Sequence, residues 1–345
     1  MEKLILGGLF IMKKLIFLLG SLLIVSTFAQ EKSAVKIVST TEFKPTDSIG
    51  LEYRIYGNTE GHNDKITKFF NATNDEWNRG SNDYSRLQTT FNVQMTEKFK
   101  LNGRIRDFNN IKDNSGENLI LGTDTRLRLY YKHNDFLTSK IEYRDTNKNY
   151  EQYAYDLKYN IFSNENGFLD SVSIIPKFKH EDQDHSNYTN KLSTELAMTG
   201  NLMFGVTWEN NYYINYNMYN HSKTYANNKS KDSEFSYDIE LYLYKTFELY
   251  KDNNKTFALN FEGGFDPYTF YQYKHVTTTP PVISYNKEYS LYSSIDLSTS
   301  YLLTDSISLK GGIGAEYRNW DKTIESEAKN WRSQPFAYVG TNIKF

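Results

Sequence analysis

The chain has 345 residues, no cysteine and a formal net charge of −2. The lack of cysteine excludes disulfide bonds and thiol chemistry, and the near balance of charges argues against nucleic acid as a partner. Aromatic residues make up 16% of the chain, with 29 tyrosines and 22 phenylalanines, although the mean hydropathy is −0.67. A transmembrane β-barrel combines these properties, because it needs apolar residues only at alternate positions and carries tyrosines at both membrane interfaces. A secreted all-β protein with a tyrosine-rich binding surface would have a similar composition.

The amino-terminal segment predicts a leader that directs export. A basic start at 12–14 is followed by an apolar core at 15–25 and a small-x-small cleavage site at 27–29. This order is typical of a secretory signal peptide. We therefore expect the mature protein to begin at Gln30.

The residues ahead of this pattern add apolar sequence before the lysine pair. Gly7 and Gly8 can be encoded by a ribosome-binding sequence, so we expect the true chain to start at Met12. Residues 1–29 are then leader and signal peptide. The polar residues 30–47 are expected as a periplasmic lead-in to a barrel over 48–345.

Apolar and polar side chains then alternate in segments that recur to the end of the chain. In the first segment, Ile49, Leu51 and Ile55 share one face, whereas Glu52 and Arg54 lie on the other, which indicates a strand with two different surroundings. Further segments of this kind lie at 87–95, 99–106, 124–132, 137–144, 150–162, 169–179, 191–199, 202–213, 234–247, 255–265, 289–302, 306–318 and 336–345. We count fourteen, with twelve to sixteen compatible with the pattern, and predict an all-β, antiparallel up-and-down transmembrane barrel.

The connections between these segments alternate in length. Short polar turns are expected at 96–98, 133–135, 251–254 and 303–305, and longer polar loops at 57–81, 109–121, 215–233, 266–288 and 319–331. Short turns at one end and long loops at the other are typical of outer-membrane barrels, in which the loops are extracellular.

The last segment ends on an aromatic residue. Phe345 shares its face with Ile343 and Val339, while small or polar residues occupy the other face. This pattern is typical of the closing strand of an outer-membrane barrel. We interpret Phe345, Ile343 and Val339 as the signal that the assembly machinery reads.

No motif for catalysis or for a bound cofactor stands out. The run HEDQDH at 180–185 separates its two histidines by five residues, not the four that place a zinc pair on one helical turn, and a solvated loop explains it. The glycines at 311–314 lie within an alternating segment, where small residues relieve curvature or crowding. We predict no enzymatic activity, no cofactor and no metal, although a hydrolase whose residues meet only in space stays an alternative.

The inner face carries the informative charges. With the apolar face outward, six arginines form a basic wall on strands two to five, with Asp124 and Glu142 among them: Arg86, Arg104, Arg106, Arg126, Arg128 and Arg144. Five carboxylates form an acidic wall on strands ten to thirteen: Asp238, Glu240, Glu262, Asp296 and Glu316. Charges on two facing walls require water, because an ion in a dry interior loses several kcal/mol. In the alternative, these charges pair between neighbouring strands and rigidify a plugged barrel.

Four segments resemble the major outer-membrane porins of fusobacteria, the FomA type. They are WNRGSNDYSRLQ at 77–88, FEGGFDPY at 261–268, GAEYRNW at 314–320 and WRSQPFAYVGTNIKF at 331–345, and the likeness covers most of the chain from about residue 51. The resemblance implies an unselective diffusion pore for small hydrophilic solutes. It also implies a homotrimer and surface loops that take part in adhesion.

We therefore predict an outer-membrane porin through which small polar solutes and ions diffuse passively. The contacts expected outside the lumen are with membrane lipid and, through the loops, with host or bacterial surface ligands. An adhesin or receptor on a closed barrel is the alternative, and a barrel enzyme such as a lipase or protease is a third hypothesis.

Overall fold

The computed structural model describes residues 47–60, 82–111, 121–146, 150–164, 167–183, 187–276, 284–319, 323–324 and 331–345. The predicted leader, and the predicted lead-in up to residue 46, lie outside these ranges. In the described part of the chain, no helix is long and apolar enough to cross a membrane.

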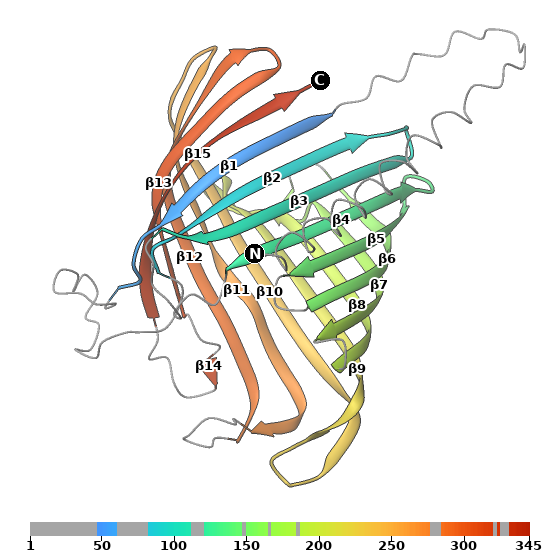
Figure 1. Cartoon of the computed structure of the whole chain (residues 1–345). Coiled ribbons are helices and arrows are strands. Elements are labelled where there is room, and N and C mark those ends of the chain that lie inside the picture. Colours follow the sequence, from blue (N-terminus) through green and yellow to red (C-terminus); the bar gives the residue numbers. More distant parts are fainter. Residues whose placement is uncertain are drawn as a thin grey trace, which may run out of the picture. The chain divides into compact units, whose positions relative to one another are not determined.

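Fourteen long strands run antiparallel, each beside the next, and close into a ring (Figure 1). They are β1 (Ser48–Tyr56), β2 (Tyr84–Gln94), β3 (Phe99–Asn110), β4 (Gly122–Lys132), β5 (Leu137–Thr146), β6 (Tyr150–Ser163), β7 (Ser171–Gln183), β8 (Asn187–Asn201), β9 (Thr207–Thr224), β10 (Ser230–Lys251), β11 (Lys255–Val276), β12 (Ser284–Thr304), β13 (Ile307–Asn319) and β15 (Trp331–Lys344). The two-residue strand β14 (Thr323–Ile324) pairs with β12. The predicted up-and-down barrel of fourteen strands is confirmed.

The outer face of the barrel is apolar and the inner face is charged. On β1, the outward side chains of Ile49, Leu51 and Ile55 are 42–43% exposed, whereas the inward Glu52 is 6% exposed. Side chains on a strand alternate between the two faces, so the same division recurs around the ring. A closed barrel with an apolar exterior satisfies every backbone group internally and spans a lipid bilayer.

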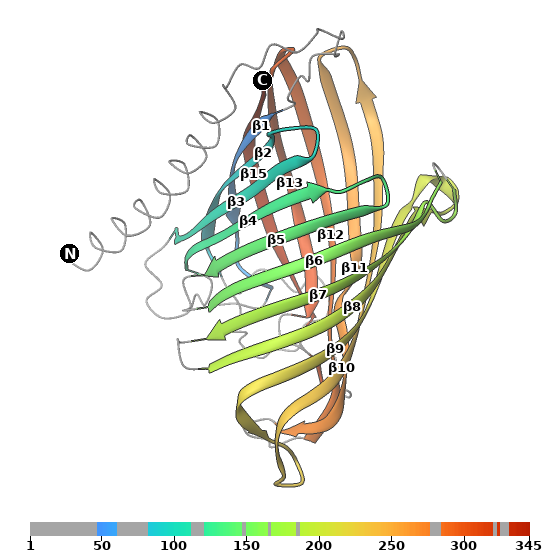
Figure 2. The same cartoon turned by 90° about the vertical axis from the view of Figure 1, so that its right-hand side faces the viewer.

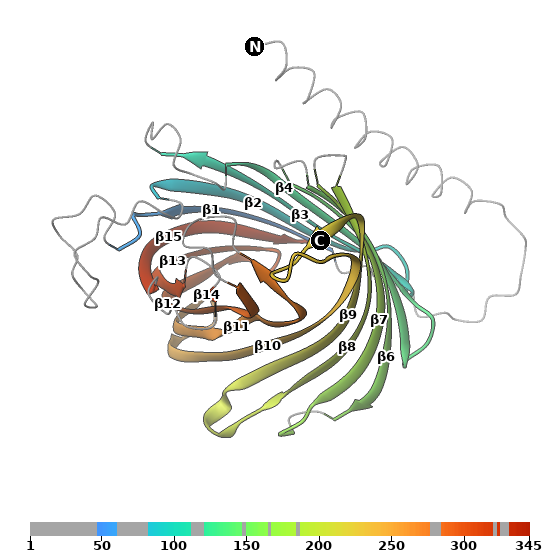
Figure 3. The same ribbon diagram turned by 90° about the horizontal axis from the view of Figure 1, so that it is seen from below.

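The first and last strands form the seam that closes the ring. Their register runs from Ser48 opposite Lys344 to Tyr56 opposite Phe336, and Figure 3 shows β1 beside β15. Asp47 and Phe345 exchange two backbone hydrogen bonds of 3.1 Å, so both ends of the barrel sequence lie at one rim.

The predicted assembly residues lie at this seam. Phe345 and Val339 are each 63% exposed and Ile343 is 39% exposed, and Val339 and Ile343 lie on the outer, apolar face. Whether an assembly machinery reads these residues stays a prediction.

The inner side of the seam is packed with aromatic rings. Tyr56, Tyr84 and Phe336 form a buried cluster in which the two tyrosine rings stack at 4.4 Å. On β13, a Cβ atom added to Gly314 would lie 2.7 Å from the Phe336 ring, and one added to Gly312 would lie 2.8 Å from the Tyr338 ring. The glycines predicted to relieve crowding therefore make room for the aromatic side chains of β15.

Short turns gather at the rim that carries the chain ends. The predicted turns at 96–98 and 133–135 lie between consecutive strands there. Those predicted at 251–254 and 303–305 also lie at this rim, but Lys251 still belongs to β10 and residues 303–304 to β12, so the turns themselves are 252–254 and 305–306. The turn between β8 and β9 contains a 3₁₀ turn, Met203–Gly205, where a strand was predicted from residue 202. Phe204 adopts a φ of 63°, so the chain reverses there rather than extending.

Two of the predicted long loops are wrong. Residues 215–224 and 230–233 belong to the hairpin β9–β10, and residues 266–276 and 284–288 belong to β11 and β12. Figure 2 shows the β9–β10 hairpin reaching past its neighbours at the rim opposite the chain ends. Polar composition was misleading here, because a strand outside the lipid is fixed by backbone pairing and needs no apolar face.

Candidate functional site on the inner face of the barrel

The register places all eleven predicted charged side chains on the inner face. Arg104, Arg126 and Arg144 stand opposite one another on β3, β4 and β5, while the residues beside them in sequence point outward. The carboxylates Asp238 and Glu240 share a face with the buried Asn211 and Asn215 of β9. In a ring of fourteen strands, β3 lies seven strands from β10 in either direction, so the two predicted walls face each other.

The basic wall is not made of free cations, because carboxylates are interleaved with it. Asp124 accepts a hydrogen bond from Arg104 Nη2 at 2.9 Å on one oxygen and from Arg144 Nε at 3.2 Å on the other. Glu142 accepts from Arg128 Nε on one oxygen and from Gln152 Nε2 at 3.1 Å on the other. Each carboxylate therefore holds side chains from both neighbouring strands.

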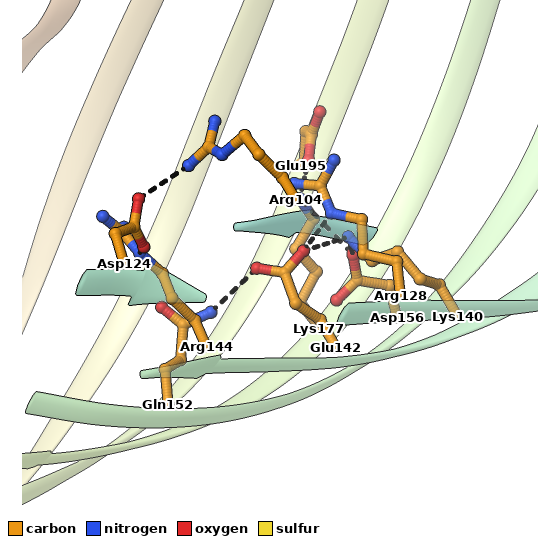
Figure 4. A network of polar contacts seen from close by, with 10 residues as sticks. All are labelled: Arg104, Asp124, Arg128, Lys140, Glu142, Arg144, Gln152, Asp156, Lys177 and Glu195. Atoms are coloured by element: carbon orange, nitrogen blue, oxygen red, sulfur yellow. Dashed lines mark hydrogen bonds and ion pairs between the residues drawn. The ribbon is translucent and has the colours of Figure 1, made fainter. Parts of the chain in front are cut away.

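The network continues onto strands where no site was predicted (Figure 4). Lys140 on β5 lies 2.6 Å from Asp156 on β6, and Lys177 on β7 pairs with both Asp156 and Glu195 on β8. These four residues were missed, although each occupies an inward position of its strand. Strand parity alone would have found them.

A second cluster crosses the seam of the barrel. Glu52 on β1 accepts from Arg86 on β2 at 2.7 Å and from Lys310 on β13 at 2.6 Å, and it lies 3.2 Å from Arg54. Lys310 reaches Glu52 across β15 because Gly340 stands between them in the register. A Cβ atom at Gly340 would lie 2.9 Å from Lys310 Cε, so glycine keeps this path clear.

Two arginines of the basic wall have no carboxylate partner in the described ranges. Arg106 donates from Nε to the amide oxygen of Gln88 at 2.7 Å. For Arg126, the structure shows neither a hydrogen bond nor an ion pair among the described residues. The pairing of neighbouring strands predicted by the alternative hypothesis therefore holds for most of this wall but not for all of it.

The acidic wall is bonded to tyrosine and asparagine rather than to cations. Tyr213 donates to Glu240 at 2.8 Å and Tyr338 to Asp296 at 3.1 Å, and Tyr242 donates at 2.9 Å to Asp266, a carboxylate of β11 that was not predicted as part of this wall. Glu262 accepts from Tyr292, and Asp238 accepts from Asn215. Within the described ranges, these five carboxylates have no lysine, arginine or histidine nitrogen at ion-pair distance. No described cationic side chain therefore compensates their negative charges. Glu316 also lies on this face, opposite Ser294 of β12.

The histidine-rich run has an ordinary structural role where it is described. His180 lies on β7 and its Nδ1 is 2.8 Å from Asn190 Oδ1 on β8, while residues 184–186 lie outside the described ranges. Among the described residues, no group of three or more His, Asp or Glu side chains could hold a metal ion.

No protein-family model and no curated protein matches the chain. Among solved structures, the chain is similar to a bacterial polysaccharide outer membrane secretin, with a TM-score of 0.42, 10% identity, and coverage of 87% of this chain and 98% of that one. It is also similar to the outer membrane channel DcaP of Acinetobacter baumannii, with a TM-score of 0.35, 11% identity, and coverage of 91% and 100%. An anion-selective porin from Comamonas acidovorans gives a TM-score of 0.35, 10% identity, and coverage of 88% and 100%.

All three identities are 11% or less and all three TM-scores are below 0.5. The protein is an outer-membrane β-barrel. Its closed ring and apolar exterior fit a lipid bilayer, and its charged inner face lines the interior of the barrel.

Proposed function

We propose that the protein is a porin through which small hydrophilic solutes and ions diffuse passively. The observation that carries the proposal is a set of inner-face carboxylates whose hydrogen-bond donors, among the described residues, are tyrosine and asparagine rather than cations: Asp238, Glu240, Glu262, Asp266 and Asp296. Ions of one sign on a dry inner surface would each lose several kcal/mol of solvation. The lumen therefore holds water, and a water-filled lumen that crosses the membrane provides a path for ions and small solutes.

Planar-bilayer recording tests this function. Purified protein added to one side of the bilayer is expected to give stepwise increases in current, each step being one inserted channel or oligomer. A matched preparation that has been heat-denatured is the control. A bilayer that stays silent, although the protein is shown to be folded and inserted, contradicts the proposal.

The four sequence segments that resemble FomA-type porins support a closer assignment to that family. On this resemblance we propose a homotrimer, whose mass native mass spectrometry of the detergent-solubilised protein measures directly. We also propose that export removes residues 1–29, so that the intact mass of the purified protein corresponds to a chain that starts at Gln30. A mass that includes the leader contradicts this second point.

One observation favours a second role in adhesion. Strands β10 and β11 are 22 residues long, whereas a tilted strand needs about 9–11 residues to cross a bilayer. The residues of these strands beyond the membrane give β9–β12 a folded surface outside the lipid. A ligand that binds to this surface does not need to enter the lumen. Cell-binding assays with the purified protein in nanodiscs test this role independently of conductance.

A further inference from the structure

We propose that Arg126 is the centre of an oxyanion-binding subsite on the inner face of β3–β5. Its ligand is a phosphate or carboxylate group carried by a solute in transit, and Arg104 and Arg144 flank it. The inference rests on the proposed pore function and deepens it, because it names a class of solute that the lumen retains briefly rather than merely admits.

Three arginines form a row across the inner face of β3–β5. Arg104, Arg126 and Arg144 are direct cross-strand partners on adjacent strands. Like charges placed directly opposite one another on a sheet destabilise it. A row of three is therefore unfavourable for the fold alone, and a structural role explains only the two outer members, which share Asp124.

Among the described residues, each oxygen of the two carboxylates nearest Arg126 already has a donor. Asp124, two residues before Arg126 on the same face, uses one oxygen for Arg104 and the other for Arg144. Glu142, the diagonal neighbour on β5, uses one oxygen for Arg128 and the other for Gln152. The central guanidinium is left with its donors unused in the described structure.

The cationic side chains around Arg126 are held in place by ion pairs. The flanking arginines are tied to Asp124, and Arg128 is tied to Glu142, so they lose little freedom when an anion arrives. A guanidinium presents a planar fork of N–H donors that matches the two oxygens of a carboxylate or phosphate. The cationic row thus offers a site in which one arginine donates and its fixed neighbours add favourable charge.

The charge balance of the patch agrees with an anionic ligand. On the inner face of β3–β5, five arginines surround two carboxylates: Arg104, Arg106, Arg126, Arg128 and Arg144 around Asp124 and Glu142. The excess is positive. A solute with one or two negative charges brings this patch closer to neutrality, whereas the facing carboxylates of β10–β12 repel it toward the arginines.

The test measures the block of the channel current by inorganic phosphate and by succinate in separate arms, against a chloride baseline. For the unmodified protein we expect each anion to lower the conductance saturably, and the two arms show whether phosphate or carboxylate is preferred. Arg126→Gln is expected to raise the half-blocking concentration about tenfold, as loss of one charge-assisted contact predicts. Arg126→Lys keeps the charge but not the planar fork of donors, so its half-blocking concentration should lie between those of the unmodified protein and of Arg126→Gln.

Lys100→Gln is the matched control. Lys100 lies on the inner face of β3, four residues from Arg104, and its replacement removes the same charge from the same wall. We expect the half-blocking concentration of Lys100→Gln to stay within about twofold of that of the unmodified protein, because an anion bound at the arginine row is beyond hydrogen-bond reach of position 100. Equal shifts for Arg126→Gln and Lys100→Gln would mean a diffuse field and overturn the subsite.

Two further readouts keep the outcomes separate. Heat-modifiable electrophoretic mobility reports folding, and if Arg126→Gln failed to fold, Arg126→Lys would carry the test with the charge retained. Calorimetric titration of phosphate into the detergent-solubilised barrel reads the subsite without conductance. Phosphate binding to a barrel that does not conduct supports the subsite and contradicts the pore function. Conduction without saturable phosphate binding contradicts only the subsite.

Discussion

At the scale of single residues, the two faces of each strand impose opposite demands on neighbouring positions. Ile295 on β12 is 49% exposed on the outer face, whereas Ser294 beside it points inward between Glu262 and Glu316. The two positions lie at the same depth in the membrane. They differ only in whether lipid or the lumen receives the side chain.

Ile295→Arg and Ser294→Arg should therefore differ strongly in stability. A charge on the lipid face near the middle of the bilayer costs about 2–4 kcal/mol, whereas an arginine at position 294 meets two carboxylates in the lumen. We expect denaturant unfolding in lipid vesicles to show a clear loss of stability for Ile295→Arg and little change for Ser294→Arg. Equal losses would mean that the assigned faces are wrong.

The sequence predicted which face each charge occupies but not its partner. Strand parity is strict, so the inward positions of Arg104 and Arg144 follow from the apolar pattern. That both arginines share Asp124 does not follow, because the choice between a direct and a diagonal neighbour depends on side-chain rotamers. For the same reason, no pattern in the sequence singles out Arg106 and Arg126 as the two arginines of the basic wall without a carboxylate partner in the described ranges.

At the scale of elements, β9–β12 form a folded extension at the rim opposite the chain ends. Its inner side holds Glu234 and His275, whose side chains are 0% and 6% exposed and which hydrogen bond at 3.0 Å. The rings of Tyr225, Tyr271 and Tyr285 surround the histidine at 4.0–5.6 Å. A buried pair between β10 and β11 therefore joins the two hairpins of the extension.

Replacement of Glu234 by glutamine should loosen this extension without opening the barrel. The amide weakens a buried, charge-assisted hydrogen bond that contributes about 1.5–3 kcal/mol. Hydrogen exchange should become roughly tenfold faster or more at the hairpin ends of β9–β12. Glu248→Gln, at the exposed opposite end of β10, is the control. Unchanged exchange at the hairpin ends would show that the pair is not what holds them.

The sidedness of the extension can be read with single cysteines, because the chain has none of its own. Lys229→Cys lies in the exposed turn of the β9–β10 hairpin, and Asn253→Cys lies in the β10–β11 turn at the other rim. We expect a membrane-impermeant maleimide to label position 229 on intact cells and position 253 only after the outer membrane is permeabilised. The reverse result would mean that the barrel is inserted the other way round.

Element boundaries were less predictable than element positions. The turn at 96–98 was found because Thr96 and its neighbours interrupt an apolar alternation that resumes at Phe99. Residues 215–233 were predicted as a loop because their asparagines and tyrosines resemble loop composition. Their strand structure comes from pairing between β9 and β10, a contact that the composition of one segment does not contain.

At the scale of the whole molecule, the two halves of the lumen carry opposite excess charge. Since neither sign dominates the chain, the ratio of cation to anion permeability should lie within a small factor of one. Combined replacement of Arg104, Arg106 and Arg128 by glutamine should tilt permeation toward cations. Combined Asp238→Asn, Glu240→Gln and Glu262→Gln should tilt it toward anions.

Reversal potentials in a salt gradient measure both shifts. They should be largest at low ionic strength, because at 0.1 M salt the screening length of about 10 Å approaches the span of the field. The first triple variant leaves Asp124 paired with Arg144 and Glu142 with Lys140, so its shift should correspond to the loss of three positive charges. If neither triple variant moves the potential, these side chains do not line the conducting path.

The architecture of the whole barrel was the most predictable feature. Fourteen alternating segments with an even count lead to a closed up-and-down ring, because open sheet edges are not tolerated in lipid. The register of the seam was not predictable. The pairing of Glu52 with Gly340 depends on packing between strands that lie almost 300 residues apart in the sequence.

The hydrogen bonds between Asp47 and Phe345 make the ring continuous, so the position at which the chain enters it is arbitrary. A circular permutant that joins residue 345 to residue 47 through a short linker, and begins at Lys255 and ends at Asp252, keeps the same neighbours for every strand. Such a permutant should fold in detergent as the original does. With the predicted leader 1–29 fused ahead of Lys255, the permutant is still exported but its Phe345 is no longer terminal. If this protein folds in detergent yet does not reach the outer membrane in cells, the terminal position of Phe345 is needed for delivery and not for folding.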